Sequence, residues 1–186
     1  MSEEFILYDR NRIPTGRKIA RGEKIPEGSY HLVVHLFVTD SSSRILIQRR
    51  RDSKETFPGR WDIAMGGSSV GEESSLEAVK RETREELGLV IEGEPLPALT
   101  VFYSEGFDDY YVLKSDLDPG KLRLQEEEVS RVRWASMDEV LSLIDSGRFI
   151  PYRRELIQLL RQMGSGDGAF FDIPPQFGVE KEDGNG

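Results

Sequence analysis

Three glutamates fall close together in a stretch that has the pattern of an amphipathic helix: Glu82, Glu85 and Glu86. A helix turns by roughly 100° per residue, so these side chains share an arc of about 100° on one face. Like charges four positions apart, such as Glu82 and Glu86, repel one another. Mg²⁺ prefers oxygen ligands and is usually held by one or two carboxylates together with water and substrate phosphate. The acidic arc is therefore either a solvated charged face or a site for a divalent cation.

The same helix is expected to have two further faces and clear ends. Ser74 and Glu77 form the Ser-x-x-Glu pattern of a capping box, and Gly88 stands where a left-handed residue would end the helix. The stripe expected to face the core consists of Leu76, Val79, Thr83 and Leu87. The side expected to face water carries Glu77, Lys80, Arg81 and Arg84. On this wheel no Lys or Arg lies within the acidic arc, which favours a bound cation.

Seven charged or glycine positions follow a fixed spacing: Gly67, Glu73, Arg81, Glu82, Glu85, Glu86 and Gly88. This spacing resembles the Nudix box, G-x5-E-x7-R-E-U-x-E-E-x-G-U, in which U is a bulky aliphatic residue. At residue frequencies of about 5–10% each, seven chance matches have a probability on the order of one in ten million or rarer. Thr83 departs from the aliphatic pattern, but its methyl group points at the core stripe.

The resemblance implies a mechanism. Nudix enzymes hydrolyse the pyrophosphate bond of a nucleoside diphosphate linked to a group X, with Mg²⁺ or Mn²⁺ as cofactor and with water attacking phosphorus. The implied metal ligands are Glu82, Glu85, Glu86 and the backbone carbonyl of Gly66 or Gly67. Arg81 would orient the carboxylates through Glu73 or Glu82, which gives Glu73 a supporting catalytic role.

The sequence leaves open which base takes the proton from the attacking water. Glu82 within the box is one candidate. Many Nudix enzymes use a carboxylate in a loop outside the box, and the candidates there are Glu105 in "YSEGF" and Glu126–Glu128 in "LQEEEV". Each of these also fits a solvated surface position. The number of metal ions and the identity of X are not fixed by the sequence either.

A basic patch is the region expected to bind substrate. It consists of Arg49, Arg50, Arg51 and Lys54. Arg49 is the preferred phosphate contact, with Arg50 and Lys54 as further substrate-binding residues; the alternative is a soluble rim beside an acidic site. Phe57 and Trp61 could stack on a base, although packing of their loop on the core is the favoured role.

A longer stretch, from Tyr30 to Glu72, resembles the Nudix branch that includes isopentenyl diphosphate isomerases and their hydrolase relatives. The isomerases carry a catalytic cysteine just before the box, where this chain has Met65, and a metal-binding histidine where it has Gly67. A thioether cannot transfer a proton, which disfavours isomerase chemistry. An isomerase-type enzyme and a catalytically silent Nudix-fold binding module are the alternatives to a hydrolase.

The elements that must position these residues follow the Nudix order. Strand patterns occupy residues 5–21 as a hairpin, 30–39, 41–50, 99–117 as two strands, and 129–136. The second and third of these are expected to be antiparallel neighbours. Two further helices are expected over 137–147 and 151–163, the latter with Pro151 in its first turn. The expected fold class is α+β: a Nudix α/β/α sandwich with a mixed sheet and an N-terminal β-hairpin extension.

The expected division of the chain is a hairpin extension at 1–29, a Nudix domain at 30–163, and a flexible tail at 164–186 rich in acid and glycine. Within the tail, "AFFDIPPQF" is a segment that could dock on the body or on a second subunit. In the long strand, His31 and His35 share one face about 13 Å apart, so they cannot bind one metal ion. Whether either histidine packs or faces a ligand is left open.

Composition limits the remaining possibilities. Cysteine is absent, which excludes disulfides and thiolate nucleophiles. The net charge of −9 opposes adhesion to nucleic acid, so the expected partner is a small diphosphate compound. No apolar run approaches a membrane span and no secretory signal is evident, so the expected location is the cytoplasm. A homodimer is an expectation at the level of the family.

Overall fold

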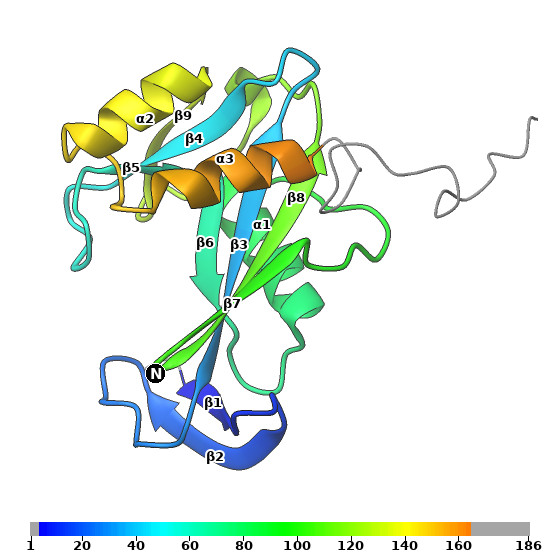
Figure 1. The fold of residues 1–186 in the computed structure, drawn as a ribbon, viewed down its shortest axis with the longest axis vertical. Coiled ribbons are helices and arrows are strands. Elements are labelled where there is room, and N and C mark those ends of the chain that lie inside the picture. The colour runs from blue at the N-terminus through cyan, green and yellow to red at the C-terminus, as the bar shows by residue number, and fades with distance from the viewer. Residues whose placement is uncertain (1–3, 165–186) are drawn as a thin grey trace, which may run out of the picture.

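The central sheet is built around β3 (His31–Thr39), a nine-residue strand rich in β-branched and aromatic residues. The computed structural model describes residues 4–164, and Figure 1 shows their arrangement. β3 pairs in parallel with β8 (Gly106–Lys114) along its whole length. On its other edge, β4 (Ile45–Arg50) is antiparallel to its C-terminal end, while β6 (Met65–Ser68) is antiparallel to its middle. β4 and β6 therefore diverge from one shared edge.

The remaining strands complete a mixed sheet of seven. β5 (Trp61–Ile63) and β9 (Val129–Ala135) both pair antiparallel with β4. β7 (Leu99–Tyr103) pairs antiparallel with β8, and the short 3₁₀ helix η1 (Pro119–Lys121) precedes β9. The predicted mixed sheet and the predicted antiparallel neighbours β3 and β4 are confirmed.

Helices cover both faces of this sheet. In Figure 1, α1 (Ser75–Leu87) lies behind the sheet, whereas α3 (Arg154–Met163) crosses in front of it and α2 (Met137–Asp145) lies beside β4 and β9. The first core joins α1 to one face through Ala78, Val79, Leu87, Val34, Leu36 and Val38. The second joins α2 and α3 to the other face through Val140, Leu143, Ile157, Leu160, Phe37, Ile45 and Ile47. The α/β/α sandwich expected from the sequence is confirmed.

The ends of α1 are those that its sequence predicts. The Ser74 hydroxyl accepts a hydrogen bond from the Glu77 amide (3.2 Å), and the Glu77 carboxylate accepts one from the Ser74 amide (2.8 Å). Gly88 ends the helix in the left-handed region, with φ of 63°. The predicted core stripe is also correct, because Val79, Thr83 and Leu87 are fully buried and Leu76 packs against the first core.

The N-terminal hairpin is present and is tied to the sandwich. It consists of β1 (Glu4–Tyr8) and β2 (Pro14–Ala20). Arg12, in its turn, donates from Nη1 (3.0 Å) and Nη2 (2.6 Å) to the carboxylate of Asp109, which is fully buried. Ser75 and Thr100 each donate to the same carboxylate at 2.6 Å. Burial alone would raise the pKa of Asp109, but hydrogen bonds from Arg12, Ser75 and Thr100 outweigh it and lower this pKa.

The start of α3 differs from the prediction by three residues. Pro151 is not in the first turn of α3, which begins at Arg154 with Arg153 as its N-cap. The chain stays extended before that because Phe149 pairs with Trp61 at the edge of β5. The tail segment at 169–177 lies outside the described residues, and the three-part division of the chain stays a prediction. Within residues 4–164, no helix is long and apolar enough to span a bilayer.

Candidate active site

The three glutamates of the acidic arc line one cavity of about 910 Å³. They differ in depth: Glu86 is 7% exposed, whereas the side chains of Glu82 and Glu85 are 16% and 51% exposed. The helix thus presents its carboxylates as a gradient from the cavity floor to its rim. A cavity of this volume is in the range that holds a small-molecule ligand.

Glu86 is the most buried acid of this group. The pKa of Glu86 is raised to about 8, mainly by burial and also by the neighbouring Glu82, against the lowering effect of the hydrogen bond from Gln48. Gln48 Nε2 donates to Glu86 Oε2 at 3.1 Å, and Gln48 is itself buried. A cation beside these carboxylates would favour their ionised forms. The floor of the cavity is therefore a place where positive charge is stabilised.

Two glycines of β6 leave room for the side chains around this floor. A Cβ on Gly67 would lie 2.3 Å from Glu82 Cδ, and a Cβ on Gly66 would lie 3.1 Å from His35 Nδ1. The absence of side chains at both positions therefore lets a carboxylate approach the β6 backbone on one side and an imidazole on the other. This close approach fits a backbone carbonyl acting as a ligand beside Glu82.

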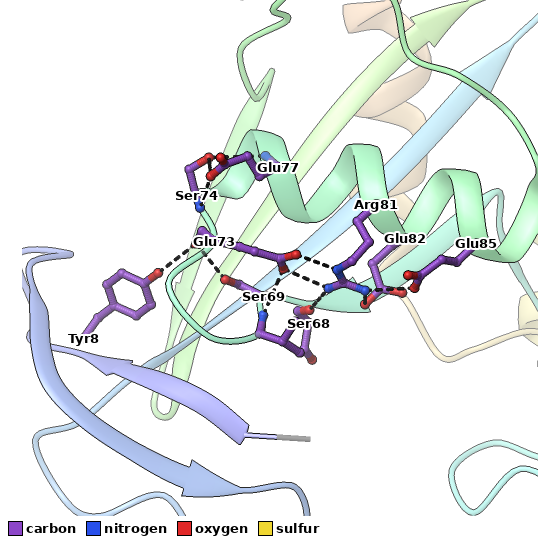
Figure 2. A network of polar contacts seen from close by, with 10 residues as sticks. Tyr8, Ser68, Ser69, Glu73, Ser74, Glu77, Arg81, Glu82 and Glu85 are labelled. Carbon is purple, nitrogen blue, oxygen red and sulfur yellow. Dashed lines mark hydrogen bonds and ion pairs between the residues drawn. The ribbon is translucent and has the colours of Figure 1, made fainter. Parts of the chain in front are cut away.

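Arg81 holds the base of the acidic arc together (Figure 2). Its Nε (2.6 Å) and Nη2 (2.9 Å) donate to the two carboxylate oxygens of Glu73. Its Nη1 lies 3.1 Å from Glu82 Oε1 and 3.0 Å from Glu85 Oε2. The hydrogen bonds to Glu73 and the charge of Glu82 raise the pKa of Arg81 above its ordinary value. The guanidinium thus connects the loop before the helix to two of its glutamates.

The helical wheel predicts that Arg81 faces water and that no Lys or Arg side chain neutralises the acidic arc. Both expectations are wrong, because Arg81 contacts Glu82 and Glu85. A helical wheel records only the direction of the Cβ atom. The long side chain of Arg81 instead reaches Glu73 and the carbonyl of Ser68 (3.0 Å), both outside the helix. The partners Glu73 and Glu82, named from the resemblance, are both among its contacts.

The donor set fits a hard divalent cation. All the acidic groups on the floor offer oxygen, and Gln48 Oε1 is buried without a hydrogen-bond partner among the described residues. Within residues 4–164, no three His, Asp or Glu side chains are grouped tightly enough to enclose an ion by themselves. An Mg²⁺ shell that takes one or two carboxylates and completes itself with backbone, water and substrate phosphate fits this arrangement.

The basic patch contributes two residues to the cavity, and Arg49 is not one of them. Arg50 and Lys54 line the cavity. Arg49 Nη2 instead donates to Asp52 at 2.9 Å. Because side chains alternate along β4, Gln48 and Arg50 share the face toward the cavity and Arg49 points to the opposite side. Of these two arginines, only Arg50 is therefore placed to reach a ligand in the cavity.

Two of the carboxylates considered as bases outside the box also reach the cavity. Glu105 and Glu128 line it, whereas Glu126 and Glu127 do not. Glu128 forms an ion pair with Lys54. Glu82, Glu105 and Glu128 therefore remain as candidates for the base.

The two aromatic residues of the β4–β5 loop have different surroundings. Trp61 packs against the second core, with the guanidinium of Arg133 4.5 Å from its ring, as the expectation of core packing requires. Phe57 does not: it is 41% exposed, lines the cavity, and has φ of 50°. Its left-handed backbone turns the side chain outward rather than onto the core.

The wall opposite α1 contains residues that sequence reasoning did not assign. It is formed by His35, Asp62, Asp108 and Tyr152, which we call the far wall. Asp62 is 2% exposed, and burial raises its pKa. Tyr152 Oη donates to Asp62 Oδ1 at 3.0 Å, and Arg50 Nη1 lies 3.9 Å from Asp62 Oδ2. Of the far-wall residues, the sequence analysis considers only His35, through its spacing from His31. That spacing does not identify Asp62 or Asp108 as part of the site.

The fold and the site together define a class of protein, an α/β/α sandwich whose box helix presents three glutamates to a ligand-sized cavity. The family model for the NUDIX domain matches residues 29–160, and the chain belongs to the Nudix family. An uncharacterized Nudix hydrolase of Listeria monocytogenes is 40% identical over 151 residues, covering 81% of this chain and 89% of that protein. With such relatives, the chain is a Nudix hydrolase, an enzyme of a family that cleaves pyrophosphate bonds.

Two further comparisons agree with this assignment. Nudix hydrolase 3 of Arabidopsis thaliana is 30% identical over 167 residues, which cover 81% of this chain and 22% of the plant protein. The crystal structure of DR0079 from Deinococcus radiodurans has a TM-score of 0.69 and 26% identity, covering 86% of this chain and 98% of that one. The likeness to the isomerase branch stays a prediction.

Proposed function

We propose that this Nudix hydrolase cleaves the pyrophosphate bond of a nucleoside diphosphate linked to a group X, with Mg²⁺ or Mn²⁺ as cofactor. The observation that carries the proposal is the pair of carboxylates Glu82 and Glu86 on the cavity floor, with Glu86 buried at 7% exposure. Two acids so placed favour a bound cation, and a cation favours a polyphosphate ligand.

The residues have distinct roles in this proposal. Glu82, Glu85, Glu86 and the carbonyl of Gly66 hold the cation, while Arg81 and Glu73 fix the carboxylates in position. When bound, the cation supplies positive charge that stabilises the diphosphate oxygens during attack by water. Arg50 and Lys54 bind the diphosphate from the other side of the cavity. One of Glu82, Glu105 and Glu128 takes the proton from water.

The test is a hydrolysis panel in which the nucleotide, the group X and the cation vary. It contains nucleoside di- and triphosphates, dinucleotides and nucleotide sugars, each with Mg²⁺, with Mn²⁺ and with EDTA. ADP-ribose is included because the Shewanella oneidensis NrtR NUDIX domain, which shares the fold at a TM-score of 0.54 and 22% identity, was solved with it. Cleavage in ¹⁸O-labelled water is expected to place the label on a phosphate product. Hydrolysis that persists at full rate in EDTA would contradict the role of the cation.

A matched pair of variants tests the phosphate contact. Arg50→Ala is expected to raise KM for a diphosphate about 10- to 100-fold, since it removes a charge-assisted contact of roughly 1.5–3 kcal/mol. Arg49→Ala is the control, because Arg49 pairs with Asp52 outside the cavity. Equal effects of the two changes would contradict the assignment. The homodimer stays a prediction, which size-exclusion chromatography with light scattering checks.

A further inference from the structure

His31 and His35 lie on the same face of β3 and both line the cavity, yet their surroundings differ completely. His31 is partnered on both ring nitrogens: Nδ1 lies 3.0 Å from the carbonyl of Glu105, and Nε2 lies 3.2 Å from Tyr103 Oη. His35 is 8% exposed, and neither of its ring nitrogens has a hydrogen-bond partner among the described residues. Buried polar groups are nearly always hydrogen-bonded, so His35 is shaped to meet a group that enters the cavity.

The ring of His35 is fixed in place by its aromatic neighbours. It stacks on Tyr110 with centroids 4.5 Å apart and planes 11° from parallel, and Tyr152 meets it edge-on at 6.3 Å. The hydroxyl of Tyr152 is in turn held by Asp62. Because Gly66 has no Cβ, this position of β6 places no side chain against the imidazole. The orientation of the ring nitrogens is therefore set before a ligand binds.

A carboxylate oxygen of Asp108 lies close enough to His35 for one ligand atom to contact both groups from the side. Asp108 Oδ1 lies 3.6 Å from His35 Nε2, beyond hydrogen-bond range, and the Asp108 side chain is 24% exposed. A hydroxyl oxygen can accept a hydrogen bond from an imidazole N–H and donate one to a carboxylate through a single atom. A phosphate oxygen cannot donate and would be repelled by Asp108 and Asp62.

The place of this pair in the cavity restricts which hydroxyl it can bind. Asp62 is close enough to interact electrostatically with both His35 and Glu86, and all three line the same cavity. A group held by His35 therefore lies near the floor that is proposed to hold the cation and the diphosphate. In a nucleoside diphosphate compound the ribose is attached directly to one end of the diphosphate, and every such compound carries it whatever the group X is.

We propose that His35 and Asp108 form a specificity-determining site for a ribose hydroxyl of the substrate, with His35 as donor and Asp108 as acceptor. This inference rests on the proposed hydrolysis of nucleoside diphosphate compounds at the same cavity. It assigns the sugar to the far wall and leaves Arg50 and Lys54 to the phosphates.

The experiment compares ADP, GDP, CDP and UDP with their 2′,3′-dideoxy counterparts, in the presence of Mg²⁺. For the wild type, kcat/KM is expected to favour the ribose compound by about 10- to 100-fold, because a site built for a hydroxyl is left with unpaired buried groups by its absence. In His35→Phe, which keeps the ring stacked on Tyr110, and in Asp108→Ala, this ratio is expected to fall to about 1–3. Equal cleavage of both members of each pair by the wild type would overturn the proposal.

The matched control is His31→Phe. Both ring nitrogens of His31 already contact protein groups, the Glu105 carbonyl and the Tyr103 hydroxyl, so they are not free to bind a ligand. This variant is expected to lower the melting temperature while keeping the wild-type ratio for ribose over dideoxyribose. Because each ratio is taken within one enzyme, a general loss of activity cancels. If His35→Phe shows no cooperative unfolding transition, Asp108→Ala alone decides the outcome. A ratio lost equally in all three variants would overturn the assignment to His35 and Asp108.

Binding separates this inference from the proposed function. Isothermal titration of the same pairs measures the ratio of Kd values without requiring cleavage. If the wild type cleaves no compound with either cation, the proposed hydrolysis is refuted, while a Kd ratio that depends on His35 and Asp108 still supports the hydroxyl site. Equal Kd values within every pair, or no binding of either member, would refute the hydroxyl site.

Discussion

The two sides of the cavity are built in opposite ways. On one side, α1 carries Glu82, Glu85 and Glu86 from a single turn and a half of helix, held by an arginine from the same helix. On the far wall, His35, Asp62, Asp108 and Tyr152 come from β3, β5, β8 and the segment before α3. The α1 side is locally encoded, whereas the far wall exists only when distant segments have packed.

This difference suggests a division of labour. A constellation on one helix keeps its internal spacing whatever happens to the loops around it, which suits a reaction that stays the same. A wall assembled from separate segments can change one residue at a time, which suits the choice of substrate. We therefore expect changes on α1 to affect kcat and changes on the far wall to affect discrimination between substrates.

The largest expected effect is on the α1 side. Glu86→Gln should lower kcat about 10²- to 10³-fold, since it removes a charge that stabilises the reacting phosphate through the cation. Because burial raises the pKa of Glu86 to about 8, its carboxyl is mostly protonated at pH 7 when no cation is present, so the melting temperature in EDTA should stay close to that of the wild type. The control is Glu72→Gln, at an exposed position of the preceding loop. If Glu86→Gln retained more than half of the wild-type kcat, the proposal that α1 carries the catalytic metal ligands would be wrong.

The two β6 glycines test the two sides at adjacent positions. Gly67→Ala should displace the Glu82 carboxylate and lower kcat roughly 10- to 100-fold, since misplacement by about 1 Å is costly in catalysis. Gly66→Ala presses on His35 at a looser 3.1 Å and should change KM more than kcat. Steady-state kinetics on one diphosphate substrate measures both. If Gly67→Ala changed mainly KM and Gly66→Ala changed mainly kcat, the proposed roles of the two sides of the cavity would be wrong.

The clamp between the hairpin and β8, formed by Arg12 and Asp109, tests how much a contact between distant segments contributes to the stability of the whole protein. Arg12→Ala leaves the buried Asp109 short of two hydrogen bonds and should destabilise the protein by about 1–3 kcal/mol. Arg10→Ala, at an exposed site in the same turn, should change stability by less than about 0.5 kcal/mol. Urea denaturation at pH 7 compares them, and similar midpoints would show that the clamp contributes nothing.

Acidity should weaken the effect of the clamp. The folded-state pKa of Asp109 is lowered below its unfolded value of about 3.9, so its stabilisation is complete at neutral pH. It is lost as pH falls below about 4 and through the folded-state pKa. The difference in stability between wild type and Arg12→Ala should therefore shrink between pH 7 and pH 3. A difference that grows on acidification would contradict this sign.

The smallest expected effect is a gain. Thr83 is fully buried, and its hydroxyl has no hydrogen-bond partner among the described residues. Thr83→Val should raise stability by about 1 kcal/mol, because it removes an unsatisfied polar group and keeps the shape. Val79→Thr is the reverse change in the same core stripe and should lower stability by a similar amount. Thermal denaturation checks both, and a loss of stability in Thr83→Val would reveal a use for the hydroxyl.

The α1 side could be predicted because its information is contiguous in the sequence. The capping box at Ser74, the left-handed Gly88 and the buried stripe through Val79 all follow from spacing along one helix. The α/β/α sandwich was predictable through the same box, since its spacing identifies a family with one fold.

The errors share one cause: the sequence does not show which way a side chain turns when its partner is remote. Arg49 and Arg50 are equally basic, and only the alternation of β4 against the cavity separates them. The helical wheel places Arg81 toward water because its partner Glu73 lies outside the helix, and only the family resemblance names that contact. The sequence does not identify Asp62 and Asp108 as site residues, because their partners Tyr152 and His35 lie in other segments of the chain.

The parallel pairing of β3 with β8 affects the order in which the enzyme folds during synthesis. The carbonyl that holds the ring of His31 belongs to Glu105, 74 residues further along the chain. Pairings of such long range close late, because the entropy of the loop is lost before the contact forms. During synthesis, a nascent chain that has reached Leu89 contains the whole box but no part of β8. The box helix is therefore synthesised before Asp108 and Tyr152, and the far wall is complete only after β8 and the segment before α3 have been added.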